Sequence, residues 1–414
     1  MKGSSRGQLE QRLLVLVTLA LVAFGLVMVY SATSAAAALG HGDPITYLKR
    51  QAIYAFAGIA LMLAASRFDH RRLRMVAPPL VLVALGLCVA VLVVGPEIKG
   101  AQRWIDLGPA SFQPSELAKL ALLVWTAAYL ARKGPPRTLA ELWRPIGMLA
   151  TLFAVLIMLE PDLGTTVALM LMLAGMLVVA GVPSRVLAGA GGIAITAGLA
   201  AIWIEPYRRA RVFSFLDPWA DPEHTGFQTV QAMIGIGSGG LTGKGLGEGV
   251  QKINYLPEQQ TDMILAVIGE ELGLIGTTAV ISAFAIFAFA GFTVALNCRD
   301  PFGKLLAAGV TSLVCGQAAV NLAAVLGVAP LTGVPLPLVS YGGSSLVVLL
   351  ASIGILLNIA LDERAPQSRF QRVASPDRRR RNSGARAPVA RSRSSAPRAG
   401  RHGDVRRVAG SRRG

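Results

Sequence analysis

The sequence predicts an all-α polytopic membrane protein, with about ten transmembrane helices and one long extracytoplasmic loop between helices 7 and 8. Of its 414 residues, 53% are hydrophobic and 15% are charged, and the mean hydropathy is +0.55. Soluble globular proteins carry about 25% charged residues, so this composition excludes an ordinary soluble enzyme. Apolar stretches of about 20 residues, each long enough to cross a bilayer, recur along the chain.

These stretches define ten predicted spans, joined mostly by short loops. The first is too long for the apolar core of a cleavable signal peptide. The eighth is longer than a bilayer requires and contains Glu270 and Glu271, so we expect its first turns at the surface or against a cavity. The spans cover residues 13–34, 51–66, 75–94, 115–131, 146–159, 163–181, 186–204, 263–296, 304–327 and 338–361.

Lys and Arg residues in the loops set the predicted orientation. With the N-terminus in the cytoplasm, the inner segments before the C-terminal tail hold 14 basic residues, and the outer segments hold nine. Five of those nine lie in the one long loop, and long loops cross the membrane whatever their charge. Ten spans also return the C-terminus to the inner side. We therefore expect both termini in the cytoplasm.

The predicted organisation is a cytoplasmic N-terminus at 1–12, a transmembrane domain at 13–362 and a tail at 363–414. The long outer loop, 205–261, is rich in Gly and aromatic residues, which favours an ordered, partly helical cap. Residues 366–414 contain 15 Arg and two acids, a net charge of +13 out of +17 for the chain. So few apolar residues predict a disordered tail, which would bind anionic lipids. The three Cys residues show neither a disulfide framework nor metal-ligand spacing.

Polar side chains gather around the outer end of the fourth span. Arg103 and Trp104 precede it; Trp104 is either an interfacial anchor or a platform for a sugar, and Arg103 could hold a diphosphate. Gln113 begins the span. Glu116 and Lys119 follow on one helical face. Charged groups inside a span normally face a bundle interior or a water-filled cavity, so this pair is either a structural ion pair or part of a binding site.

Three further candidates lie at other outer ends. Asp162 is most simply the N-cap of the sixth span. Arg208 lies in a run of three Arg that could hold lipid headgroups or substrate phosphates. Lys244 follows the Gly-rich stretch 235–240, which lacks the strand–helix setting of a dinucleotide site and the spacing of a phosphate-binding P-loop. A cradle of backbone amides for an anion and a flexible hairpin both remain open there.

The strongest local signal is Tyr255-Leu-Pro-Glu-Gln-Gln-Thr-Asp262. It sets two carboxylates, Glu258 and Asp262, at the outer mouth of an apolar span, where Asp262 is either a helix N-cap or a general base. Near the last span, residues 331–345 include two Pro, three Gly and Ser340. Broken backbone near membrane depth is tolerated where protein shields it or where it lines a cavity, so this segment is either a cavity wall or a kinked start of the span.

These segments resemble the SEDS family (shape, elongation, division and sporulation), and its cell-division members more than its elongation members. Ordered matches extend over residues 13–362, about 85% of the chain. One departure concerns the carboxylate segment, where the family commonly has His-Thr-Asp-Phe and this chain has Gln260-Thr-Asp262-Met263. The matching segments are 99–120 (KGAQRWIDLGPASFQPSELAKL), 160–165 (EPDLGT), 207–219 (YRRARVFSFLDPW), 255–273 (YLPEQQTDMILAVIGEELG) and 335–345 (PLPLVSYGGSS), together with the Gly-rich loop.

The resemblance implies a peptidoglycan glycosyltransferase that polymerises lipid II, a disaccharide-pentapeptide on undecaprenyl diphosphate, into β-1,4 glycan strands during septal wall synthesis. Asp262 is the implied essential carboxylate. A single displacement needs one base to take the proton of the attacking hydroxyl and passes through an oxocarbenium-like transition state. Cations would hold the leaving diphosphate; the candidates are Arg103, Lys119, Arg208 and Lys244. The resemblance implies no certain cofactor, and it leaves open whether a divalent cation is required beside the diphosphate.

The resemblance also implies partners and a location. A class B penicillin-binding protein and other cell-division proteins are the expected partners, with no nucleic acid, at the septum of a bacterial cytoplasmic membrane. Three alternatives stay open. A lipid II flippase should show a charged path across the whole membrane, whereas the polar residues here gather at outer ends. A non-catalytic scaffold would need only binding surfaces, and an elongation member would carry out the same chemistry elsewhere in the cell.

Overall fold

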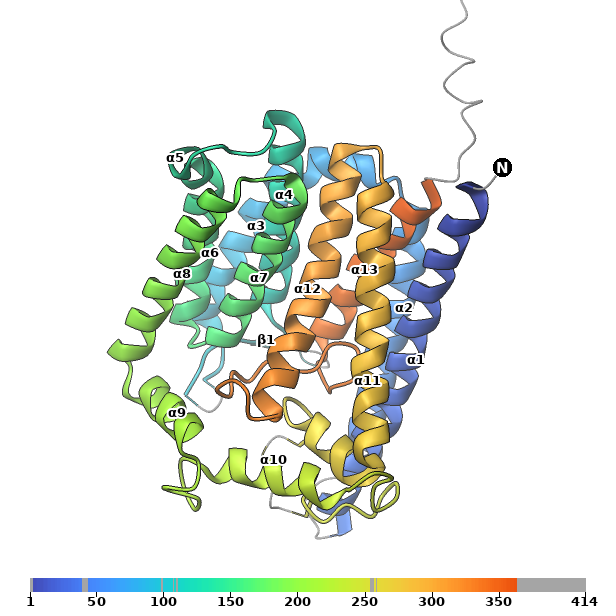
Figure 1. The fold of residues 1–414 in the computed structure, drawn as a ribbon, viewed down its shortest axis with the longest axis vertical. Helices are drawn as coiled ribbons and strands as arrows, with labels where there is room; N and C mark the ends of the chain where they lie inside the picture. The colour runs from blue at the N-terminus through green and yellow to red at the C-terminus, as the bar shows by residue number, and fades with distance from the viewer. Residues whose placement is uncertain are drawn as a thin grey trace, which may run out of the picture. The chain divides into compact units, whose positions relative to one another are not determined.

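The computed structural model describes residues 3–38, 44–97, 100–106, 108, 111–253, 257 and 259–362. The predicted tail at 363–414 lies outside these residues. The described chain is a helical bundle with one two-stranded hairpin (Figure 1). Its elements are α1 (Gly3–Ala38), α2 (Pro44–Arg67), η1 (His70–Arg72), α3 (Leu73–Val94), β1 (Ile105–Asp106), β2 (Ser111–Phe112), α4 (Pro114–Lys133), α5 (Leu139–Leu142), η2 (Trp143–Gly147), α6 (Met148–Leu159), α7 (Leu163–Ala180), α8 (Ser184–Ile204), α9 (Pro206–Leu216), α10 (Phe227–Ser238), α11 (Ile264–Asn297), α12 (Pro301–Val325) and α13 (Ser344–Asp362).

The predicted all-α membrane fold is confirmed. Among the described residues, nine helical stretches are long and apolar enough to cross a membrane. The predicted fourth span corresponds to α4, a 20-residue helix whose charged residues lower its hydropathy. It packs against α3, α7 and α12 as a tenth member of the bundle. Buried charge is tolerated in α4 because neighbouring helices surround it.

Local sequence explains where several helices begin and end. Asp162 is the N-cap of α7, as predicted, and accepts a hydrogen bond from the Thr165 amide at 2.9 Å. Pro at the first turn, where its missing N–H costs nothing, starts α4, α9 and α12. Gly181 ends α7 in the left-handed conformation.

The predicted last span begins too early. It was expected from residue 338, but α13 begins at Ser344. The preceding segment contains Pro335, Pro337 and the glycines at 342 and 343, and it contains no α-helix. Leu338 and Gly343 have positive φ values of 65° and 47°, outside the right-handed helical region, so the hydropathy of these residues does not make them helical. This irregular segment borders the site described below.

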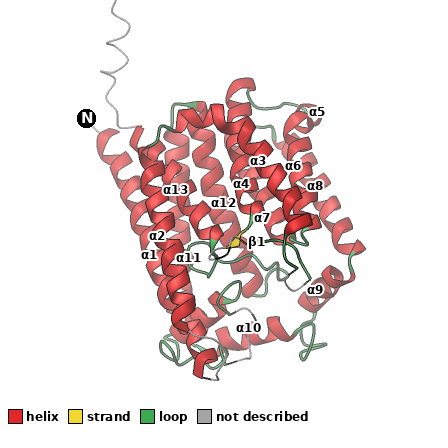
Figure 2. Cartoon of the chain, turned by 180° about the vertical axis from the view of Figure 1, so that it is seen from behind, coloured by secondary structure: helices red, strands yellow, loops and turns green. Residues whose placement is uncertain are grey.

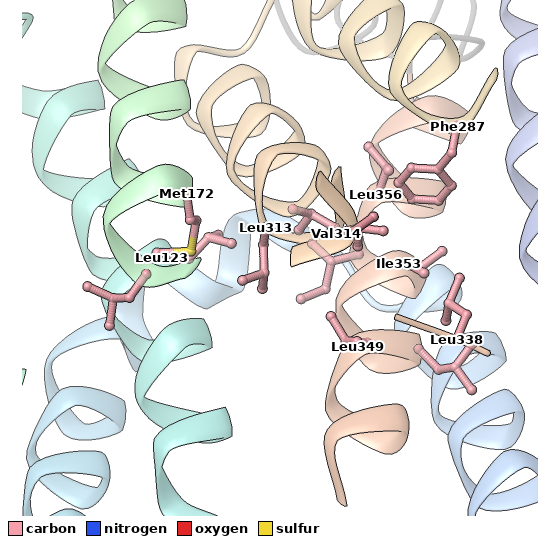
Figure 3. Close-up of a cluster of buried hydrophobic side chains, with 14 of the residues drawn as sticks. Leu123, Met172, Phe287, Leu313, Val314, Leu338, Leu349, Ile353 and Leu356 are labelled. Carbon is pink, nitrogen blue, oxygen red and sulfur yellow. The ribbon is translucent and has the colours of Figure 1, made fainter. Parts of the chain in front are cut away.

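The apolar core centres on α12 and α13. In each of them, 72% of the most apolar 18-residue window is buried, against none of that window in α8 at the edge of the bundle. Figure 3 shows side chains from five helices meeting there: Leu123, Met172, Phe287, Leu313, Val314, Leu349, Ile353 and Leu356. Large apolar side chains that remain exposed on the outer helices are what a lipid-facing surface requires.

The described part of the long loop, 205–253, 257 and 259–261, is partly helical, as predicted, and forms a cap. It contains α9 and α10, which lie beyond one end of the bundle, while the start of α1 lies at the opposite end (Figure 1). Seen from behind, loops and β1 fill the space between the helix ends and α10 (Figure 2). The α11 helix breaks at Gly273, whose φ of 64° suits glycine. Residues before this break belong to the capped end of the bundle.

Candidate active site

A cavity of about 930 Å³ opens at the capped end of the bundle. Its wall combines the hairpin region, the α6–α7 turn, α9, the start of α11 and the irregular segment before α13. Segments far apart in the sequence therefore supply one site. The predicted site residues that line it are Arg103, Trp104, Gln113, Glu116, Asp162, Arg208 and Asp262.

Asp262 lies at the start of α11 but does not act as its N-cap. The cap position belongs to Met263, and no side chain caps this helix. The Thr261 hydroxyl lies 3.3 Å from Asp262 Oδ1. On the other side, a β-carbon added at Gly333 would lie 4.0 Å from Asp262 Oδ2. The carboxylate therefore borders the cavity between Thr261, which precedes it in the chain, and the segment that carries Gly333.

Three guanidinium groups face the same cavity and are anchored on backbone carbonyls. Arg103 donates to the carbonyls of residues 160 and 161, and Arg208 donates to those of residues 158 and 201. Arg211 donates to the carbonyl of residue 331 at 3.2 Å and lies over the ring of Tyr207. None of the three pairs with a carboxylate of the described residues. Their positive charge is available to an anionic ligand.

Glu116 and Lys119 form an ion pair within α4. The Lys119 Nζ lies 2.9 Å from Glu116 Oε1, and the two residues are 4% and 1% exposed. Among the described residues, Glu116 Oε2 has no hydrogen-bond partner. Glu116 lines the cavity and Lys119 lies behind it. The pair is nearly neutral as a unit, so it suits hydrogen bonding better than binding of a phosphate charge.

Gln113 and Asp162 tie α4 to α7. The Gln113 amide donates to Asp162 Oδ2 at 3.1 Å, and the Thr165 hydroxyl donates to the same oxygen at 2.8 Å. Because Asp162 also caps α7, its carboxylate is satisfied by protein donors. Its role in the cavity wall is structural in the unliganded protein.

The sequence profile of the family described as "Cell cycle protein", which covers FtsW, RodA and SpoVE, matches residues 11–365. The chain belongs to this family. It is the SEDS family of the motifs above, and the chain is FtsW-like. A protein of Geobacter sulfurreducens named "Probable peptidoglycan glycosyltransferase FtsW" is 42% identical over 350 residues, which cover 84% of this chain and 94% of that relative. "Stage V sporulation protein E" of Bacillus subtilis is 37% identical over 354 residues, or 84% and 96% of the two chains.

Solved structures agree with this membership. One, described as "Structural coordination of polymerization and crosslinking by a peptidoglycan synthase complex", has a TM-score of 0.70 and 33% identity, covering 84% of this chain and 97% of that one. The Rod shape determining protein RodA of Thermus thermophilus has a TM-score of 0.63 and 31% identity, covering 85% and 97%. Both likenesses extend over the whole membrane domain.

Besides Lys119, two of the predicted site residues that the structure describes, Lys244 and Ser340, do not line the cavity. Lys244 forms an ion pair with Glu270 at 2.7 Å, and the amides of Val250 and Gln251 donate to the same carboxylate. Lys244 and these two amides thus hold the protein's own Glu270, whereas the Gly-rich stretch 235–240 lies mostly within α10 and supplies none of these contacts. Ser340 donates to the carbonyl of residue 261 and is a backbone anchor. Glu258 lies outside the described residues.

One carboxyl group near the cavity, that of Glu160, was not among the predicted site residues. Glu160, in the turn between α6 and α7, is fully buried, and neither carboxylate oxygen has a partner among the described residues. The pKa of Glu160 is raised to about 8, mainly by burial and also by nearby Asp162, while Arg103 opposes the rise. Glu160 is therefore largely protonated at neutral pH. Its backbone carbonyl, by contrast, anchors Arg103.

Two amide side chains of α12 were also missed. Gln317 lines the cavity, and Asn321, one turn further on, is 2% exposed. Polar amides within an otherwise apolar span were the available signal. For metal ions, the described residues contain no group of three or more His, Cys, Asp or Glu side chains suited to hold one. A divalent cation bound with the substrate stays a prediction.

Proposed function

We propose that this protein polymerises lipid II into β-1,4 glycan strands by single displacement, with Asp262 as general base. The broader activity follows from the family: the chain is a peptidoglycan glycosyltransferase, as its FtsW relatives are named. The observation that carries the finer proposal is the cavity. Asp262 lines it together with Arg103, Arg208 and Arg211, none of which forms an ion pair with a carboxylate of the described residues. A base and a diphosphate site in one enclosure are what this reaction needs.

In the proposed reaction, a sugar hydroxyl of the acceptor attacks the anomeric carbon of the donor. Asp262 takes the hydroxyl proton as the new C–O bond forms, and the bond to the diphosphate breaks on the opposite face. A positioned base contributes roughly 10²–10⁴-fold. The diphosphate leaves with its electron pair and its negative charge, and it needs no acid when cations hold it. Asp262 then returns its proton to water.

The other cavity residues have proposed roles that follow from their charge. Arg103, Arg208 and Arg211 bind the diphosphate because their guanidinium groups suit phosphate oxygens. Glu116 accepts a hydrogen bond from a sugar through its unpartnered Oε2, while its Oε1 is paired with Lys119. The cavity, about 930 Å³, is at the upper end of small-molecule sites, which span roughly 300–1,000 Å³. Trp104 and Gln113 complete its wall.

We infer the cellular setting from the same evidence. The peptidoglycan is built outside the membrane, so the capped end with the cavity faces outward and both termini face the cytoplasm. The solved synthase complex described above supports a partner that crosslinks the strands, and we propose a class B penicillin-binding protein. Septal location, further cell-division partners and lipid binding by the basic tail at 363–414 belong to this proposal as well.

A flippase is less well supported. It needs a polar path across the bilayer, whereas the buried middle of the bundle is filled by apolar side chains such as Leu313, Val314 and Ile353. The residues that line the cavity lie toward the capped end of the described bundle. This distribution favours chemistry at one membrane surface.

The test uses the purified full-length protein with its class B partner and labelled lipid II, and it resolves the glycan products on a gel. Wild type should give a ladder, and Asp262→Asn should abolish it. Glu223→Gln, at an exposed acid of the same cap, is the matched control and should polymerise normally. A ladder from a folded Asp262→Asn would overturn Asp262 as the base. No ladder from wild type, where a known polymerase works, would overturn polymerase activity and favour the flippase or scaffold.

A further inference from the structure

Three consecutive backbone carbonyls at the proposed base are held by hydrogen bonds. The carbonyl of residue 260 accepts from the Tyr341 amide at 2.8 Å, and that of residue 261 accepts from the Ser340 hydroxyl at 2.5 Å. The carbonyl of residue 262 accepts from the Asn321 side-chain amide at 2.7 Å. Two donors come from the segment before α13 and the third comes from α12. The backbone of Asp262 is therefore fixed from two independent elements.

Asn321 makes a second contact that the other donors lack. Its Nδ2 also donates to the carbonyl of Val334 at 2.8 Å, so both protons of the amide are used. Because both partners are carbonyl oxygens, the nitrogen and not the oxygen of the amide must face them. The residue is 2% exposed and does not line the cavity. It therefore acts on its two partners without reaching a ligand.

The two partners belong to neighbouring segments of the cavity lining beside the base, since Asp262 and Val334 both line the cavity. Val334 follows Gly333, and a β-carbon at Gly333 would lie 4.0 Å from Asp262 Oδ2. The Asn321 amide spans the backbone of Asp262 and the backbone next to Gly333. It thereby fixes the distance between the carboxylate and the wall that faces it. Positions set to within about 1 Å decide how well a base meets its proton, and such errors can cost about 10²-fold.

We propose that Asn321 is a positioning residue for the general base, which holds Asp262 against the 330–335 wall through its paired carbonyl contacts. This inference rests on the proposed function, because it assumes that Asp262 is the base. Asn321 contacts no substrate. Its removal lowers the rate of the chemical step and leaves lipid II binding unchanged.

The test compares Asn321→Ala and Asn321→Leu with wild type in steady-state polymerisation by the full-length protein with its partner. Both variants lack the donor, and Leu also restores the side-chain volume. We expect kcat to fall about 10²-fold in both, with KM for lipid II within about twofold of wild type, because an interaction acting only on the chemical step lowers kcat and kcat/KM equally. Agreement between Ala and Leu separates the missing donor from a cavity left by a smaller side chain.

Asn358 offers a matched control. It is also a bundle asparagine whose Nδ2 donates to a backbone carbonyl, that of Ser66 at 2.9 Å, but it lies near the end of α13. Asn358→Ala should lower thermal stability without changing kcat more than about twofold. Hydrogen–deuterium exchange supplies a second readout: exchange of the peptide covering 259–264 should rise in Asn321→Ala and not in Asn358→Ala. This readout requires no activity, so it still applies if Asn321→Ala is inactive for other reasons.

The outcomes distinguish the two proposals. Unchanged kcat in a folded Asn321→Ala, while Asp262→Asn is inactive, overturns the positioning role and leaves the proposed function intact. A raised KM with unchanged kcat also overturns it, since Asn321 would then serve binding. Full activity of Asp262→Asn overturns the base itself. If Asn321→Ala does not fold, Asn321→Ser keeps a donor, and loss of activity with unchanged exchange at 259–264 in that variant overturns the proposal.

Discussion

Glu160 makes the stability of this protein fall as the pH rises, and Glu160→Gln should remove that dependence. The residue is fully buried without a hydrogen-bond partner among the described residues, and its pKa is about 8 instead of 4.5. An unfolded chain loses this proton above about pH 4.5, whereas the folded protein keeps it until about pH 8. The folded state therefore binds more protons across that window, and the free energy of unfolding decreases as the pH rises through it.

The magnitude follows from the shift. Each pKa unit corresponds to about 1.4 kcal/mol, so the full window amounts to a few kcal/mol. Because this loss is complete only near pH 8, the largest difference between the wild type and Glu160→Gln appears in alkaline solution. The amide is neutral at every pH and fits the same apolar surroundings, so the variant should be the more stable protein at pH 9.

The assay is thermal unfolding of both proteins in detergent at a series of pH values between 5 and 9. Subtracting the two curves removes the contribution of every other titrating group. Glu205→Gln, at an exposed carboxylate of the cap, should behave as wild type. A Glu160→Gln variant whose Tm falls as steeply as wild type between pH 5 and 9 would refute a protonated, buried Glu160.

Three other predictions concern the cations and the tail. Arg208→Ala should lower kcat/KM for lipid II about 10²-fold by removing a diphosphate contact, with Arg209→Ala as the control; equal effects of the two, in the gel assay, would contradict a specific role. Lys252→Met should lower the free energy of unfolding by about 3–5 kcal/mol, because it leaves the fully buried Glu271 unpaired; an unchanged Tm would be inconsistent with this pair. Deletion of 366–414 should leave polymerisation by the purified protein intact and weaken its localisation, and loss of purified activity would contradict this.

Much of the fold is predictable because one simple physical constraint dominates it. A bilayer core requires long apolar helices, and loop charge and proline position set most of their limits. Asp162 as a helix cap and the helical content of the long loop follow from equally local patterns. The start of α13 was misplaced because hydropathy does not report backbone conformation, and Leu338 and Gly343 adopt positive φ values that a right-handed helix excludes.

The site is less predictable because its contacts join distant segments. Lys244 follows a stretch with the composition of an anion cradle, but only the fold reveals that the anion it pairs with is Glu270, 26 residues later. Glu160 and Asp162 look alike in sequence. Asp162 accepts hydrogen bonds from Gln113 and Thr165, whereas the Glu160 carboxyl group has no partner among the described residues. Asn321 stands alone among apolar residues, and its importance depends on two carbonyls that only the folded chain brings to it.

Glu270 and Glu271 have a consequence for how a substrate reaches the cavity. Both carboxylates are fully buried and each is paired with a lysine of the cap, Lys244 and Lys252 respectively. Lifting the cap would separate both carboxylates from their lysines, and the loss of each ion pair would cost about 3–5 kcal/mol. The cap therefore behaves as a fixed wall and not as a lid. A substrate whose lipid tail stays in the bilayer must then enter sideways, between helices, from the plane of the membrane.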